Sequence, residues 1–370
     1  MTNDIETTIN KEEDLQPYEE KERKLVTQPY DMSVQTVVEQ IRNGDIFLEP
    51  PYQREYRWSN EKASRFIESL LLNIPIPNIF LAEEDDVTYT VIDGRQRLNT
   101  IKNFISPENE KERIILHGLQ VRNDLNGKKF EELDKKDQGK LKKQYLRCSV
   151  ILNDSDPQIK FDVFERLNTG SEKLQPQEIR NCTYRGNFNE LIKKLAKNNN
   201  FKSMLKLNAS NSKNMTDVEY VLRFFAYSLD IGNYKGSVGE FLNNFMRTHR
   251  NLKDEEIKNY QNLFETTVNR LYSVLGNNAF KRYVPDKKNW YSVTNKALYD
   301  AEMVAFSKVD ISNLSKEKLE IIKEEIKIKM SDEEFIKTIE RTTNIVERVL
   351  KRINDITQIL LNNGGIKIES

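Results

Sequence analysis

The five residues Asp93-Gly94-Arg95-Gln96-Arg97 have the types and the spacing of a phosphate-binding turn. Residues 87–92 before them alternate as a strand does, and apolar residues recur at helical spacing after Gly94. A strand that turns directly into a helix presents the positive end of the helix dipole at the turn. Gly94 permits a close backbone approach, and the two arginines offer fork-shaped donors to phosphate oxygens. The alternative is an ordinary Asp-Gly turn with solvated arginines, and these five residues alone do not decide between the two.

A second group of residues suited to ligand contact lies in segment 50–58, which is too polar for a core strand. Its aromatic rings could stack on a base or a sugar, and its polar side chains could reach the phosphate of a nucleotide or of DNA. In the other interpretation the segment is a surface loop whose last rings, Tyr56 and Trp58, are anchored in the core. The ring candidates are Tyr52, Tyr56 and Trp58, and the phosphate candidates are Gln53 and Arg54.

A third group stands at the end of an expected helix, where Asn168-Thr169-Gly170 could place donors around a phosphate. Glu165 and Glu178 are candidates, together with Asp93, to hold a Mg²⁺ ion bound to the nucleotide. Glu178 is equally explained as an exposed acid in the first turn of a helix, where its charge favours the helix dipole.

Several catalytic chemistries are excluded by what the sequence lacks. His117 and His249 are the two histidines and lie far apart, so neither a His-Asn-His nuclease nor a zinc hydrolase is expected. The sequence contains no Gly-x-x-x-x-Gly-Lys-Ser/Thr P-loop and no Gly-x-Ser-x-Gly nucleophile elbow. Cys148 and Cys182 belong to no Cys-x-x-Cys pair and are expected to be reduced, inert thiols.

Hydrophobic periodicity predicts the elements that must position these groups. Strands and helices are expected to alternate up to about residue 185, and nearly all patterns after it are helical. The expected elements of the first part are a helix over 61–72, strands over 78–82 and 87–92, a helix over 95–106, a hairpin or short strand over 114–125, a polar helix over 130–145, a strand over 145–152 and a helix over 157–167. The predicted fold class is therefore α+β, with an α/β N-terminal domain followed by an all-helical C-terminal domain.

The last helix is expected to be long and amphipathic. It would open at the capping-box spacing Ser331-x-x-Glu334 and run to Asn363-Gly364, a length of about 30 residues. Apolar residues from Phe335 to Leu360 alternate at four and three residues, which is a heptad seam. Such a helix either packs along its own domain or pairs with a second copy in a homodimeric coiled coil.

Composition bounds the number of domains and the partners. A chain of 370 residues is long enough for two domains, and 58 basic against 58 acidic residues leave no net charge, so contact with nucleic acid must come from local patches. We predict a disordered charged tail over 1–28 and domains over 29–185 and 186–370. No apolar run resembles a signal peptide or reaches the ~20 residues of a membrane span, so a soluble, cytoplasmic protein without a membrane partner is expected.

Four motifs in this order make residues of about 30 to 185 resemble the N-terminal domain family of GmrSD-type restriction systems, which has a ParB/sulfiredoxin-like fold. The motifs are Tyr52-Gln53-Arg54 with Trp58, Ile74-Pro75-Ile76-Pro77, Val91 to Leu98, and Phe164 to Gly170. The resemblance continues more weakly to about residue 310. Many relatives carry a C-terminal His-Asn-His nuclease domain, whereas the helices that end this chain lack the required histidines.

The resemblance implies nucleotide binding and hydrolysis at an Asp-Gly-Gln-Gln-Arg motif, used in prokaryotic defence against foreign or modified DNA. The motif falls on Asp93 to Arg97, with Arg95 in place of the first Gln. The added cation is expected to strengthen phosphate contact and to displace a catalytic amide. The family motif marks Asp93 and Gln96 as catalytic candidates, and the implied ligand is a nucleoside triphosphate with Mg²⁺.

The function expected from these observations is that of a nucleoside triphosphatase or a nucleotide-gated sensor of foreign or modified DNA, without nuclease activity of its own. Gly94, Arg95 and Arg97 would hold the phosphates, and Arg97→Ala is expected to abolish binding without harming the fold. One alternative is a DNA-recognition module without turnover, whose aromatic residues in segment 50–58 read a modified base. Another is a regulatory subunit that recruits a separate nuclease through its C-terminal helix.

Overall fold

The computed structural model describes residues 24–48, 58–84, 88–155, 157–167, 175–207 and 215–368. The chain divides into two compact units between Thr183 and Tyr184. We call the described residues up to Thr183 the sheet unit and those from Tyr184 the helical unit. Each unit has hydrophobic clusters of its own. Among the described residues, no helix is both long and apolar enough to cross a membrane.

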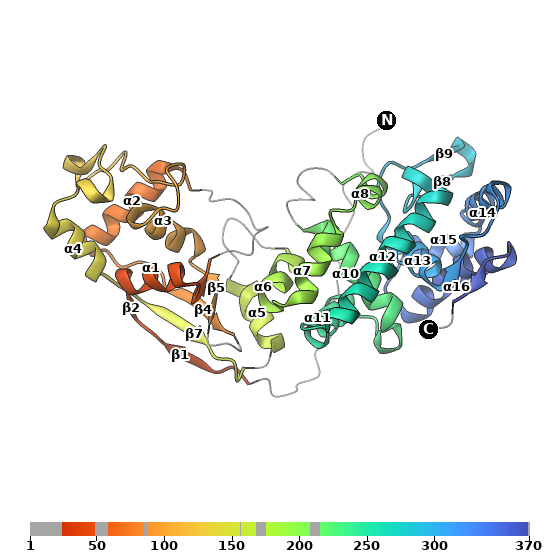
Figure 1. Cartoon of the computed structure of the whole chain (residues 1–370), viewed down its shortest axis with the longest axis horizontal. Coiled ribbons are helices and arrows are strands. Elements are labelled where there is room, and N and C mark those ends of the chain that lie inside the picture. Colours follow the sequence, from red (N-terminus) through yellow and green to blue (C-terminus); the bar gives the residue numbers. More distant parts are fainter. Residues whose placement is uncertain are drawn as a thin grey trace. The chain divides into compact units, whose positions relative to one another are not determined.

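The sheet unit is built on a five-stranded mixed sheet with strand order β1-β7-β4-β5-β3. Strands β1, β7, β4 and β5 are labelled side by side in Figure 1. The central strand β4 pairs antiparallel with β5 and parallel with β7, and β5 pairs parallel with β3. The strands expected near 78–82 and 87–92 are thus confirmed as neighbours. The strands are β1 (Thr27–Pro29), β3 (Ile46–Phe47), β4 (Ile79–Glu83), β5 (Tyr89–Asp93) and β7 (Cys148–Ile151).

Apolar side chains alternate between the two faces of this sheet, and each face belongs to a different cluster. Leu81 and Val91 belong to the larger one, while Ala82 and Ile92 belong to the smaller one. The larger cluster includes residues of α1 (Val34–Asn43), α2 (Asn60–Leu71), α3 (Arg95–Ile105) and α4 (Lys135–Lys143), and the smaller one residues of α5 (Pro157–Leu167) and α6 (Pro176–Thr183). This unit also contains the strand pair β2 (Met32–Ser33) and β6 (Tyr145–Leu146) and the short 3-10 turns η1 (Asn123–Leu125) and η2 (Phe130–Glu132).

The prediction of a disordered tail as far as residue 28 is wrong at its C-terminal end. Thr27 and Gln28 belong to β1, which pairs antiparallel with β7 at the edge of the sheet. The amide of Leu152 also donates to the carbonyl of Val26 at 2.9 Å. Strand pairing uses backbone groups, so a segment with few apolar side chains can still be held in a sheet. The pattern of apolar side chains gives no sign of these backbone hydrogen bonds, so it did not predict β1.

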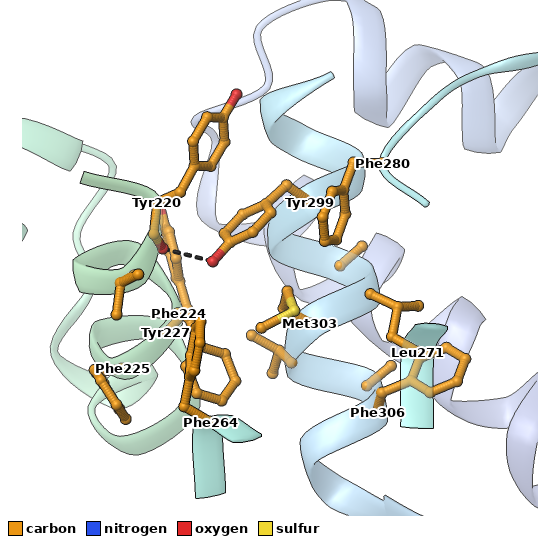
Figure 2. Close-up of a cluster of buried hydrophobic side chains, with 14 of the residues drawn as sticks. Tyr220, Phe224, Phe225, Tyr227, Phe264, Leu271, Phe280, Tyr299, Met303 and Phe306 are labelled. Carbon is orange, nitrogen blue, oxygen red and sulfur yellow. Dashed lines mark hydrogen bonds between the residues drawn. The ribbon is translucent and has the colours of Figure 1, made fainter. Parts of the chain in front are cut away.

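The helical unit is organised around α13 (Lys296–Lys308), whose residues 297–307 are all buried. Figure 2 shows aromatic side chains of other elements packed around it, with Tyr299 donating to the carbonyl of Tyr220 at 2.6 Å. The other helices are α7 (Asn187–Leu195), α8 (Asn199–Leu205), α10 (Thr216–Leu229), α11 (Val238–Thr248), α12 (Asp254–Leu275), α14 (Lys316–Lys329), α15 (Glu333–Glu340) and α16 (Val346–Asn362), with 3-10 turns η3 (Ile231–Asn233), η4 (Gly276–Asn278) and η5 (Pro285–Lys287).

The helical unit also contains two short antiparallel strand pairs, so it is mostly helical rather than all-helical. The strands β8 (Tyr283–Val284) and β9 (Asn289–Trp290) form a hairpin between α12 and α13. The second pair joins β10 (Val309–Asp310) to β11 (Ile366–Lys367).

A buried ionic triad links three helices of this unit. The Arg223 guanidinium of α10 donates to both carboxylate oxygens of Asp300 on α13, at 2.9 and 2.5 Å. Arg352 of α16 lies 3.4 Å from the same carboxylate. All three side chains are almost fully buried. Such a triad fixes which helices meet, because removing one member leaves an uncompensated buried charge.

The prediction of one long C-terminal helix is wrong. The chain leaves the helix after Glu340 and resumes it at Val346, with Thr342 at a positive φ of 43°. Arg352 donates to the carbonyl oxygens of Thr338 and Thr343, at 3.2 and 2.6 Å, so groups freed by the break gain a partner. Two adjacent threonines are poor helix formers, which favours a break here.

The apolar seam of this region packs inside its own unit. The seam side chains of Phe335, Ile339, Val349, Ile356 and Leu360 are buried in the main cluster of the helical unit. The first of the two interpretations of the seam therefore describes the structure. The homodimer and the recruitment of a nuclease remain predictions, and the buried seam residues are not the surface that would serve either of them.

Candidate functional site

The predicted strand, turn and helix around Gly94 are present. Strand β5 ends at Asp93, Gly94 has a φ of 100°, and α3 begins at Arg95. A Cβ at position 94 would lie 3.0 Å from Ile79 Cγ1 and 3.2 Å from a terminal nitrogen of Arg97. Both the backbone angle and the close contact require glycine. The chain thus turns tightly from the strand into the positively polarised end of a helix.

Arg97 ties this turn to the segment that precedes β4. Its Nη2 donates to Asp93 Oδ2 at 2.9 Å and to the carbonyl of Asn78 at 3.1 Å, and its Nη1 donates to the carbonyl of Pro77. The residue is 8% exposed. Burial lowers the pKa of the Arg97 guanidinium, and the charge of Asp93 opposes this effect. In this geometry Arg97 positions the turn, and its contacts are with protein acceptors.

Arg95 and Gln96 occupy the first turn of α3 and are half-buried. The two residues place a guanidinium and a carboxamide beside the N-terminus of a helix, where an anion is favoured. Asp93, the other polar side chain of the turn, is 42% exposed and paired with Arg97. The structure therefore brings the motif residues together around one turn, with a positioning pair and two further polar side chains.

Seven of the sequence candidates lie outside the described residues. They are Tyr52, Gln53, Arg54 and Tyr56 of the aromatic segment, and Asn168, Thr169 and Gly170 after α5.

Trp58 is described and packs at the start of α2. Its ring makes an edge contact with Phe66, with ring centroids 5.5 Å apart. The ammonium group of Lys62 lies 4.9 Å from the centre of the Trp58 ring. The ring is half-buried against the larger cluster. This arrangement is the anchored one of the two interpretations, and it gives Trp58 a packing role.

The predicted acidic ligands of a metal ion are not assembled. Glu165 is exposed on α5, whereas Glu178 is completely buried on α6. Across the described parts of the chain, no three His, Cys, Asp or Glu residues are close enough to share a metal ion. The interpretation of Glu178 as an exposed acid is also wrong. Its Oε2 accepts from the amide of Gln175 at 2.8 Å, so it caps the helix from a buried position.

Helix α6 carries a buried polar group in which Asn181 follows the Pro176 to Asn181 pattern visible in the sequence, whereas Gln177 and Arg180 were not singled out. Gln177 donates to Asn181 Oδ1 at 3.0 Å, and Arg180 donates to Gln177 Oε1 at 3.2 Å. All three side chains are at most 3% exposed. Ile179 of this helix belongs to the same apolar cluster as Ile92, which directly precedes the turn. The sequence signal that could have predicted these buried polar side chains is that α6 has few apolar residues, although a helix that covers a sheet face must bury one side.

The two cysteines are free and buried, as expected of inert thiols. Burial is the main factor that raises the pKa of the Cys148 thiol, to about 12. A thiol with so high a pKa is a poor nucleophile at neutral pH.

Comparison with protein families gives two matches. Residues 34–185 match the model described as GmrSD restriction endonuclease, N-terminal domain. Residues 249–336, in the helical unit, match the model described as mitochondrial HMG-box protein CIM1. Comparison with curated proteins and with solved structures gave no match. The first match covers the turn just described and the strands β3, β4, β5 and β7, whereas β1 precedes it. Residues 34–185 are therefore similar to the N-terminal domain of GmrSD restriction endonucleases, which relates this part of the chain to restriction and defence.

Proposed function

We propose that the sheet unit binds a nucleoside triphosphate at the Asp93 to Arg97 turn and uses its binding or hydrolysis to control a restriction response to foreign or modified DNA. The observation that carries the proposal is the geometry of Gly94. A glycine-only turn leads from a strand into the N-terminus of α3, within a domain of the GmrSD family. Turns of this kind are suited to bind phosphate.

In this proposal the residues of the turn have different tasks. Arg95 and Gln96 contact the phosphates, since their side chains stand at the helix N-terminus. Asp93 and Arg97 hold the turn against the carbonyls that precede β4. Mg²⁺ would be held mainly by the phosphates of the nucleotide, with at most one or two carboxylates of the chain.

The replacement of the first Gln of the family motif by Arg95 should strengthen nucleotide binding and slow turnover. It adds a cation where the family motif has an amide, which strengthens attraction for phosphate. Orientation of the attacking water then depends on Gln96 without its neighbouring amide. We therefore propose tight binding with slow hydrolysis, and no nuclease activity in this chain.

The test is a titration of the purified protein with ATP, GTP, CTP and UTP in the presence of Mg²⁺. Calorimetry follows binding, and phosphate release is measured in the same samples. Saturable binding of at least one nucleotide supports the proposal, and release above a protein-free control adds turnover. If none of the four nucleotides binds, the turn is not a nucleotide-binding site and the proposal is wrong.

A DNA-recognition module without turnover is the second candidate, and the β8-β9 hairpin favours it. Lys287 and Lys288 are exposed at its tip, and Tyr291 beside them is 47% exposed. The hairpin lies inside the segment that matches the HMG-box family model, and HMG boxes bind DNA. DNA affinity that falls steeply with salt, is indifferent to nucleotide and is lost in a Lys287→Ala, Lys288→Ala variant would favour this candidate.

A further inference from the structure

A small hollow lies at the end of β5 opposite to the turn. Tyr89, the first residue of β5, lines it, whereas Asp93 is the last residue of that strand. The hollow has a volume of about 90 Å³. It is lined by side chains from neighbouring strands and their ends, namely Gln28, Tyr30, Glu83, Tyr89, Val150 and Leu152. None of these residues belongs to the proposed nucleotide site.

Two tyrosine rings form the aromatic wall of this hollow. The ring centroids of Tyr30 and Tyr89 are 6.4 Å apart, and the ring planes are tilted by 41°. The Tyr30 side chain is 40% exposed, so the wall is open to solvent. The faces of such rings carry negative electrostatic potential. Burial raises the pKa of the Tyr89 phenol, and the negative charge of Glu83 raises it further, so this ring stays neutral near pH 7.

The carboxylate of Glu83 is fixed beside the rings by its neighbours. Its Oε2 accepts from the amide of Asn153 at 3.0 Å. The Lys160 ammonium of α5 donates to Asn153 Oδ1 at 3.0 Å and to the Glu83 carbonyl at 3.1 Å. The negative charge of Glu83 is thus held in place next to the two rings. A side chain that is already ordered loses less conformational entropy when a ligand binds to it.

We propose that this hollow binds an organic cation, an ammonium or guanidinium group of side-chain size, between the Tyr30 and Tyr89 rings and the Glu83 carboxylate. Ring faces together with a carboxylate attract such a cation, whose hydrocarbon part can rest on Val150 and Leu152. Nucleic acid is disfavoured, because the Glu83 carboxylate of the hollow and the adjoining Glu84 repel phosphate. The site is independent of the proposed nucleotide site.

The cation can come from a free small molecule or from a basic side chain of another protein, and the choice of probes separates the two. The full-length chain is titrated in a calorimeter at physiological ionic strength with choline, spermidine and N-acetyl-arginine methylamide. The neutral isostere of choline, 3,3-dimethylbutan-1-ol, controls for the contribution of charge. Tighter binding of choline or spermidine indicates a small molecule, and tighter binding of the amino-acid amide indicates a protein side chain.

Three variants locate the binding in the hollow. Tyr30→Ala and Glu83→Gln are each expected to weaken the preferred cation by about 5- to 20-fold, whereas Tyr30→Phe keeps the ring and the affinity. Glu83→Gln retains a side-chain oxygen for the amide of Asn153, and thermal melting checks that all three variants fold. Tyr145→Ala and Glu39→Gln, which alter exposed residues outside the hollow, serve as controls and should bind as the unaltered chain does.

Three results would overturn the proposal. The first is the absence of saturable binding for every cation probe. The second is binding of the neutral isostere as tightly as choline. The third is an unchanged affinity in Glu83→Gln, which would place the cation elsewhere on the chain.

Discussion

Arg97 joins the last residue of β5 to two carbonyls ahead of β4 through one guanidinium. We predict that Arg97→Ala lowers the free energy of unfolding of the sheet unit by about 1–3 kcal/mol, because charge-assisted hydrogen bonds and packing are lost together. The expectation that this substitution spares the fold is thereby revised. Urea denaturation measures the change, with the exposed Arg42→Ala as control. Equal midpoints for the two variants would show that Arg97 does not hold the turn.

Glu302, in the core of the helical unit, gives a prediction about pH. Its Oε2 accepts from the amide of Phe280 at 2.7 Å, and burial raises its pKa from 4.5 to about 8. A carboxyl whose pKa is higher in the folded than in the unfolded chain contributes stability below pH 4.5 that is lost as the pH rises toward 8. Burial lowers the pKa of the neighbouring Lys281 to about 8, so the titration of Lys281 changes the stability mainly above pH 8.

Glu302→Gln removes this titration while keeping the shape of the neutral acid. The variant and the unaltered chain should have similar urea midpoints at pH 5, and the variant should become the more stable of the two as the pH approaches 8. A constant difference between the two proteins over this range would mean that the buried carboxyl does not titrate there.

At the scale of elements, the break between α15 and α16 rests on two arginines with different burial. Arg352 is 1% exposed and donates to two carbonyls of the break, and it lies beside Asp300. Arg348 also donates to backbone near the break, to the carbonyls of Lys337 and Arg341, but from an exposed position. Buried charge partners cost far more to remove than exposed ones.

We therefore predict that Arg352→Met costs about 3–5 kcal/mol of stability, because it leaves Asp300 with one cation and the break without its donor. The matched substitution Arg348→Met should cost less than about 1 kcal/mol. Denaturant unfolding followed by circular dichroism compares the two. Equal costs would mean that the buried arginine does not fix the junction of the helices.

In the whole molecule, sequence patterns predicted the features that neighbouring residues determine, and they missed those that depend on contacts between distant segments. The strand, turn and helix around Gly94 were predictable, because alternation, a glycine and helical spacing follow one another within 20 residues. The i, i+4 spacing of Asp93 and Arg97 was also visible, but not the carbonyls that bind Arg97. The break at Thr342 depends on Arg352 and its buried surroundings. The heptad spacing of apolar residues carries no information about these contacts, so the break could not be predicted from it. The burial of Glu178 depends on the sheet face under α6.

The central claim is that the turn at Gly94 binds nucleotide through Arg95, and the variants of Arg95 test it most directly. Arg95→Ala should weaken the preferred nucleotide by about 10- to 100-fold, since a charged donor to phosphate is lost. Arg95→Gln restores the family motif, and it should retain measurable binding and release phosphate faster than the unaltered chain. Arg42→Ala controls for the loss of a surface charge, and thermal melting confirms that each variant is folded.

The measurement is the calorimetric titration of these proteins with the preferred nucleotide and Mg²⁺. We predict saturable binding of the nucleotide to the unaltered chain and to Arg42→Ala. Arg95→Ala should lose much of this affinity at an unchanged melting temperature. Binding of Arg95→Ala with the affinity of the unaltered chain would contradict this prediction, because the nucleotide would then be held somewhere other than the turn.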